Sequence, residues 1–381
     1  MDGVPVARLF GIEIRIHWSW VLILALVAAL AAVEVGVVAP GLDPAVQWLI
    51  GGLVSAGFLA SAAAHDLGHA VMSRRRGLIV DGVAVSFFGG SSPFDRSAAT
   101  ARDEMAIAAA GPVVSLLVGL ALGAGSLVLA TVGGDALQAA GLFGLLLGGL
   151  NILLGLVNFL PAYPLDGGRL FRALIWSRTG DQRRGTRLVA TSGSFLGLLL
   201  LGAGVVVTIY SDLGNGMMVM LSGWFLRLTA RGAASRAELE ALADGLLVGD
   251  VMEPVGNPIS PGLTIDTFVG QVLEASPPRT AVLVSRGAEL LGMAGVAQIQ
   301  RLRRSDWPKT RVEDVMVPRE KLTEISPDSP VWPALVQLRD AGLDGLPVSG
   351  PDGPVGIVTV RGIAAALQAR KPAGRPRSRL L

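Results

Sequence analysis

The sequence predicts an α-helical polytopic membrane protein that is followed by a pair of small α/β domains. Hydrophobic residues make up 51% of the 381 residues and charged residues only 16%, a balance too apolar for an ordinary soluble protein of this length. Apolar runs that reach the length of a membrane span, about 20 residues, all lie before position 231. The sequence after that position has a soluble composition and contains an internal repeat.

Six apolar segments are expected to cross the membrane. The first exceeds the core of a signal peptide and lacks a small-residue cleavage site, so we expect it to be retained. The sixth is short, and Arg227 interrupts it, although an arginine near a helix end can extend its charged head to the interface. The segments are 17–39, 46–73, 104–131, 136–158, 186–210 and 214–230.

The distribution of arginines predicts the orientation. Arginines lie before the first segment, between the second and third, and between the fourth and fifth, whereas the connections at 40–45, 132–136 and 211–215 contain no Lys or Arg. The positive-inside rule then places the amino terminus and the carboxyl-terminal domains in the cytoplasm, in a multi-pass protein of the plasma membrane. The net charge of only +2, with its basic residues segregated, gives no electrostatic case for a nucleic-acid partner.

Two of the three histidines lie four residues apart in the second apolar segment, in His65-Asp66-Leu67-Gly68-His69. At 3.6 residues per turn both rings face the same side of a helix, where they can hold one metal ion. Ionisable side chains at membrane depth are costly and by default mark a functional site. Because the chain has no cysteine, any metal must be held by histidine and carboxylate.

A matching carboxylate follows the fourth apolar segment, in Asn158-Phe-Leu-Pro-Ala-Tyr-Pro-Leu-Asp166-Gly-Gly-Arg. The two prolines and the glycine pair break the helix, and such backbone is tolerated at membrane depth only inside protein or beside a water-filled cavity. By the predicted topology Asp166 arrives at the same cytoplasmic depth as His65 and His69. Two histidines and one carboxylate leave a fourth position for water, which is typical of a catalytic zinc.

These two motifs resemble those of the site-2 protease family of intramembrane zinc metalloproteases. The stretches Ala109–Pro112 and 88–90 (Phe-Gly-Gly) are also similar to that family, so the resemblance covers about 10–230. It implies one Zn²⁺ per chain on His65, His69 and Asp166, with Asn158 assisting at the active site. It also implies a transmembrane or membrane-proximal peptide as substrate, cut in regulated proteolysis.

Asp66 is the main departure from the family pattern, which has a glutamate directly after the first histidine. An aspartate can still accept a proton from water, but its shorter side chain displaces the reacting oxygen by about 1 Å, and such a misplacement can cost about 100-fold in rate. Three alternatives stay open: a working protease with an adapted pocket, a slow protease, or a zinc-binding relative that does not cut. A transporter regulated by the carboxyl-terminal pair is the competing class.

Two further features complete the domain organisation. The residues of segment 78–92 alternate in hydropathy, and the segment ends in glycines, which predicts a short β-hairpin element. This element either offers a strand edge to the substrate or is a structural hairpin. After 231, Val248–Met252 recurs as Val312–Met316 in two units of about 64 residues that resemble a tandem pair of cystathionine-beta-synthase (CBS) domains. The expected parts are 1–232 membrane domain, 233–247 linker, 248–310 and 311–370 CBS domains, and 371–381 disordered basic tail.

The resemblance to CBS domains implies two partners, an adenine nucleotide and a second copy of the chain. The family's nucleotide-contacting pattern places an Asp three residues after a Thr or Ser. Here Thr359 is followed by Gly362, and the corresponding positions of the first unit are Gly295 and Gln298. We therefore expect weak nucleotide binding or none, and a structural or dimerising role for the pair.

Overall fold

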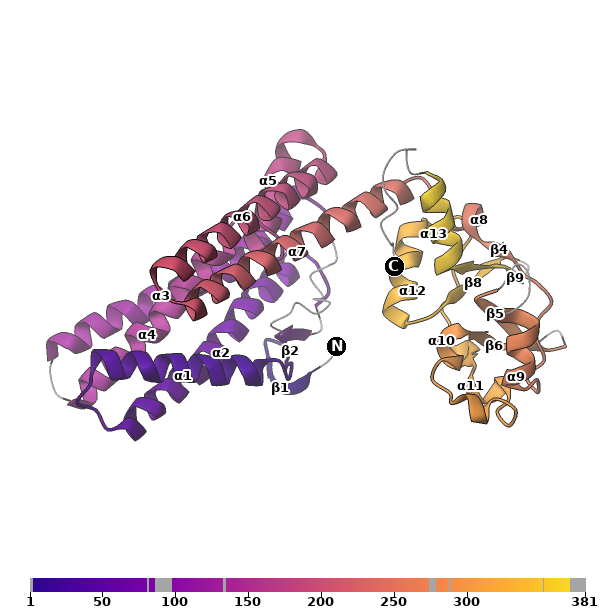
Figure 1. Cartoon of the computed structure of the whole chain (residues 1–381). Helices are drawn as coiled ribbons and strands as arrows, with labels where there is room; N and C mark the ends of the chain where they lie inside the picture. The colour runs from indigo at the N-terminus through magenta and orange to yellow at the C-terminus, as the bar shows by residue number, and fades with distance from the viewer. Residues whose placement is uncertain are drawn as a thin grey trace. The chain divides into compact units, whose positions relative to one another are not determined.

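The computed structural model describes residues 3–80, 82–85, 98–132, 135–273, 279–287, 289–351 and 353–370. They belong to two compact units, Met1–Ala237 and Glu238–Leu381, which Figure 1 colours from indigo to magenta and from orange to yellow. The stretch Phe88-Gly-Gly90 and the expected tail 371–381 lie outside the described residues. The architecture expected from the sequence, a helical membrane domain followed by a pair of small α/β domains, is confirmed.

Long helices build the first unit (Figure 1). Five of them contain a stretch that is long and apolar enough to cross a membrane, namely α1, α2, α3, α4 and α6. Many large apolar side chains on these helices are exposed, such as Leu117 on α3 at 61% and Leu199 on α6 at 52%, as expected for surfaces that face lipid. The bounds are α1 Trp20–Val38, α2 Pro44–Arg75, α3 Ala101–Val132, α4 Asp135–Asn158, α5 Asp166–Thr179, α6 Gln182–Tyr210 and α7 Leu213–Ala243.

The sixth expected span, 214–230, lies in α7 but is less apolar than the other five. Asn215, several glycines and Arg227 lower its hydropathy, so α7 is not among the described helices that qualify by length and composition. It nevertheless packs antiparallel along α6 through glycines. A Cβ atom on Gly223 would lie 2.6 Å from the carbonyl oxygen of Gly197, and one on Gly204 would lie 2.8 Å from that of Gly216. Close backbone approach of this kind is characteristic of helix pairs within membranes.

The first unit also contains a small sheet with strand order β1-β2-β3. Its first two strands precede α1, and the third follows α2. Strands β1 (Val4–Leu9) and β2 (Ile12–Ile16) form an antiparallel hairpin, and β3 (Gly82–Val85) pairs with β2 in parallel. The segment 78–92 therefore contains a strand, as the sequence predicts, but its described partner comes from the amino terminus rather than from a hairpin within the segment. The amino-terminal hairpin was not anticipated, because its short strands lie directly before a long apolar run that dominates the pattern.

The second unit contains two three-stranded sheets, with orders β5-β6-β7 and β4-β9-β8. Its strands are β4 Glu253–Pro254, β5 Ala281–Arg286, β6 Glu289–Gly295, β7 Val317–Pro318, β8 Gly345–Gly350 and β9 Gly353–Thr359. Its helices include α8 Val248–Val251, α9 Ile265–Phe268, the π-helical turn Val269–Leu273, α10 Val296–Ile299, α11 Val312–Val315, α12 Val331–Ala341 and α13 Val360–Ala369, with 3₁₀ turns at Arg304–Asp306 and Arg319–Lys321.

The internal repeat is visible in the register of the two hairpins. Ala281 pairs with Gly295 and Gly345 with Thr359, and each hairpin has an irregularity at the same place, between Val284 and Ser285 and between Val348 and Ser349. The first strand of each repeat is exchanged, since β4 pairs with β9 and β7 pairs with β6. The two halves expected at 248–310 and 311–370 therefore each add one short strand to the other's sheet.

Candidate metal centre

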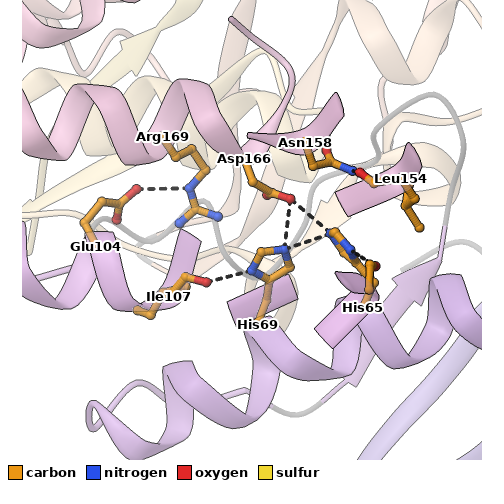
Figure 2. A network of polar contacts seen from close by, with 9 residues as sticks. His65, His69, Glu104, Ile107, Leu154, Asn158, Asp166 and Arg169 are labelled. Atoms are coloured by element: carbon orange, nitrogen blue, oxygen red, sulfur yellow. Dashed lines mark hydrogen bonds and ion pairs between the residues drawn. The ribbon is translucent and has the colours of Figure 1, made fainter. Parts of the chain in front are cut away.

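Helix α2 brings His65 and His69 onto one face, and both side chains are buried, with 6% and 4% exposure. Their Nε2 atoms lie 3.3 Å apart. Figure 2 shows the two rings pointing toward the same point, where they meet the carboxylate of Asp166. The four-residue spacing in the sequence thus produces the shared face that it predicts.

Asp166 is the first residue of α5 and is carried by the broken segment 159–165. Neighbouring helices hold this segment: Ser192 of α6 donates to the carbonyl oxygen of Pro161 (2.5 Å), and Thr229 of α7 donates to that of Tyr163 (3.1 Å). Gly168 permits a close backbone approach, because a Cβ atom there would lie 2.8 Å from the carbonyl oxygen of Ala162. The prolines interrupt the helix, and Gly168 lets α5 start directly beside the backbone of this broken segment.

The donor set fits a zinc ion. The Oδ2 atom of Asp166 lies 3.0 Å from Nε2 of His65 and 3.2 Å from Nε2 of His69. With zinc–ligand bonds of about 2.0 Å in a tetrahedron, ligand atoms are separated by about 3.3 Å. The three separations match this value, and the two nitrogens and one oxygen are the ligand types that zinc accepts. The described part of the chain has no other cluster of three such residues.

Helix α3 supplies the surroundings of both histidines. The Nδ1 atom of His65 lies 2.8 Å from the hydroxyl of Ser115, and Nδ1 of His69 lies 2.7 Å from the carbonyl oxygen of Ile107. Such contacts fix the ring orientation and leave Nε2 for a metal. Gly111 provides the space between them, because a Cβ atom there would lie 2.6 Å from Nε2 of His65 and still closer to Nε2 of His69.

The two other predicted site residues lie close to this group. Asp66 follows His65 on α2 and is half-buried. Asn158 is the last residue of α4, and its amide donates to the carbonyl oxygen of Leu154 (2.9 Å), as Figure 2 shows. This bond to its own helix uses one of the two N–H groups of the Asn158 amide.

Sequence reasoning missed Ser115 and the carbonyl of Ile107. Gly111 was noticed only as part of Ala109–Pro112, with no role assigned to it. The spacing of Gly111 and Ser115 on an apolar helix could have indicated a face turned toward polar groups. A main-chain carbonyl carries no residue signature, so Ile107 could not have been found in this way.

Comparisons with known proteins place this geometry in a family. Residues 132–200 match peptidase family M50. The zinc metalloprotease Rip3 of Mycobacterium tuberculosis, described as putative, is 31% identical over 365 residues, which cover 95% of this chain and 92% of the relative. The chain belongs to the site-2 protease family, M50. A similarly described zinc metalloprotease of Synechocystis, sll0528, is 28% identical over 96% of both chains.

This site-2 protease family member is a membrane zinc metalloprotease, and the transporter alternative is not favoured. Residues 312–369 match the CBS domain. Among solved structures, the site-2 protease from Methanocaldococcus jannaschii aligns with a TM-score of 0.36 and 21% identity, covering 61% of this chain and 95% of that one.

Proposed function

We propose that His65, His69 and Asp166 hold one zinc ion per chain and that this centre cleaves peptide bonds of transmembrane or membrane-proximal segments. The observation that carries the proposal is the convergence of two imidazole nitrogens and one carboxylate oxygen, with separations of 3.0, 3.2 and 3.3 Å, from helices far apart in the sequence. These are the separations that a shared tetrahedral ion requires.

The residues then divide the work between them. When bound, zinc supplies Lewis acidity, which polarises a carbonyl group and lowers the pKa of water. Asp66 is the general base that accepts the proton of the attacking water and can return it to the leaving amine. The amide of Asn158 donates a hydrogen bond to the substrate or to the developing oxyanion.

The substrate must present an extended peptide bond to this centre. A helical peptide bond is shielded because its carbonyl and amide are paired within the helix, so a transmembrane substrate has to unwind locally before cleavage. In the part of the chain that the structure describes, β3 is an edge strand of its sheet, and Val83 and Val85 share a hydrophobic core with Ala70 of α2. This edge offers one place where an unwound segment can pair.

The remaining assignments concern topology and partners. We propose a multi-pass protein of the plasma membrane with the amino terminus and the CBS pair in the cytoplasm, in agreement with the arginine distribution. The membrane domain then comprises 1–232, the linker 233–247 and the pair 248–370. The pair acts as a regulatory or dimerising element, with little or no binding of adenine nucleotide.

Zinc content measured beside cleavage tests the central proposal. Wild type is expected to contain one zinc per chain and to cut a model transmembrane substrate, whereas His65→Ala and Asp166→Ala lose both properties. His17→Ala is the matched control, because His17 contacts Ser19 (3.0 Å) and is outside the proposed ligand set. Equal zinc in all four proteins would overturn the assignment.

A further inference from the structure

A buried ion cluster links α3 to the helix that carries Asp166. Glu104 is only 1% exposed, and its Oε1 atom accepts from Nε of Arg169 (3.0 Å) and from Nη2 of Arg172 (2.7 Å). Both arginines belong to α5, three and six residues after Asp166. Figure 2 shows Glu104 and Arg169 to the left of Asp166, with His65 to its right and His69 below it. The proposed chemistry assigns no role to this cluster.

Glu104 also belongs to a stripe on α3 that contacts both histidines and, through Glu104, the arginines of α5. Its members follow one another at intervals of three, four and four residues, which is one face of a helix. Ile107 accepts from His69, Gly111 leaves the space beside both rings, and Ser115 contacts His65. The stripe is Glu104, Ile107, Gly111 and Ser115.

We propose that Glu104 is a positioning residue, which sets the position of Asp166 relative to the histidines by anchoring α5 to α3 through Arg169 and Arg172. The inference rests on the proposed zinc site. Since Ser115 and Ile107 orient the rings from the same helix, α3 fixes all three ligands against one rigid element. A carboxylate buried among apolar helices is retained only when paired. Here the pairing of Glu104 with the arginines of α5 fixes the position of Asp166 relative to His65 and His69.

The neighbouring residue provides a matched control. Asp103 also lies in the first turn of α3 and also pairs with an arginine, Arg76 (3.0 Å). That arginine follows the end of α2 and does not belong to α5. Asp103→Asn therefore removes the same charge from the same helical turn and leaves the anchoring of α5 intact.

The experiment compares zinc affinity and the absorption spectrum of the cobalt-substituted protein in wild type, Glu104→Gln and Asp103→Asn, purified as full-length protein in detergent. Loss of a residue that orients metal ligands costs about 10- to 100-fold in metal affinity. We expect Glu104→Gln to weaken zinc binding by about tenfold and to change the cobalt spectrum, while Asp103→Asn retains both wild-type properties. Arg169→Gln is expected to match Glu104→Gln, and the double variant to add little.

Equal zinc affinity and equal cobalt spectra in Glu104→Gln and Asp103→Asn would overturn the inference, even if Glu104→Gln melts at a lower temperature. If Glu104→Gln does not fold, the comparison is made between Glu104→Asp, which withdraws the carboxylate from α5, and Asp103→Glu, with the same expectations. A wild-type protein whose zinc content equals that of His65→Ala would instead contradict the zinc assignment itself, so the two failures are distinguishable.

Discussion

Gly111 of α3 lies directly against the Nε2 atom of His69, so close that a Cβ atom at position 111 has no room while the ring keeps its place. Nε2 of His65 borders the same space. The glycine therefore holds open the position in which the proposed ion sits. Its requirement is one of volume and does not come from an unusual backbone conformation, since Gly111 is an ordinary residue of a helix.

Gly111→Ala is expected to abolish or strongly weaken zinc binding while the bundle stays folded. An added methyl group in a packed site costs about 1–3 kcal/mol, which corresponds to about 5- to 150-fold in a binding constant. Zinc titration and thermal unfolding in detergent check this. Gly123→Ala on the same helix is the control, because nothing lies within 4 Å of a Cβ atom there, and wild-type zinc affinity is expected. Normal zinc affinity in Gly111→Ala would show that the ion does not occupy this space.

Sequence could predict the parts of the centre that depend on helical periodicity and on helix-breaking residues. The spacing of His65 and His69 predicts a shared face, and the prolines before Asp166 predict an opened chain that brings a carboxylate to the same depth. The support from α3 could not be predicted, because it depends on which helix packs against α2. That choice is a matter of three-dimensional packing, which a single apolar pattern leaves undetermined.

A similar limit applies to the fold. The apolar runs predict the spans, and the repeated Val-Met segments predict the two units of the CBS pair. The exchange of β4 and β7 between the sheets could not be predicted from the sequence, because strands of two residues show no periodicity. The amino-terminal β1 and β2 were missed for a related reason: six and five residues beside a long apolar run give a weak strand signal.

The CBS pair is expected to bind AMP and ATP weakly or not at all. Two of its own carboxylates already accept hydrogen bonds from groups at the starts of α10 and α13 that could otherwise donate to a nucleotide. Oδ2 of Asp344 accepts from the main-chain amide of Ala297 at the start of α10 (2.6 Å), and Oε1 of Glu253 accepts from the hydroxyl of Thr359 at the start of α13 (3.2 Å). A phosphate group would meet negative charge at both places. Calorimetric titration of the purified protein is expected to give dissociation constants weaker than about 1 mM.

Two variants sharpen this prediction. Asp344→Asn and Glu253→Gln remove the competing charges and are expected to bind nucleotide more tightly than wild type. Asp340→Asn is the control, because Asp340 is exposed and pairs with Arg339 (3.4 Å) at the surface. A micromolar dissociation constant for the wild-type protein would show that the CBS pair binds nucleotide despite these carboxylates.

The carboxyl terminus is expected in the cytoplasm, on the side opposite the α6–α7 turn. Five apolar helices precede residue 211, so from a cytoplasmic amino terminus that position lies outside the cytoplasm. Helix α7 then crosses back beside α6, in line with the close approach of Gly223 to Gly197. Reporters fused after Ser211 and after Leu381 are expected to report opposite sides. The same side for both would mean that α7 does not cross.

Asp66 is the proposed general base of this metalloprotease. If its carboxylate is the base, Asp66→Asn keeps zinc, because the ligands are unchanged, and loses cleavage. Asp66→Glu restores the side-chain length found in the family. An oxygen misplaced by about 1 Å costs about 100-fold in rate, so cleavage by Asp66→Glu is expected to rise by as much as that factor.

The measurement is the turnover of several transmembrane substrates by zinc-loaded protein, with His65→Ala setting the background. A fall in activity for Asp66→Glu would mean that the helices around Asp66 have closed in to suit the shorter side chain, which still assigns it to the catalytic centre. Background turnover in wild type, Asp66→Asn and Asp66→Glu alike, with zinc retained in all three, would identify a relative that binds zinc without cutting. Zinc content and turnover must therefore be measured on the same preparations, because only their combination separates a lost base from a lost metal.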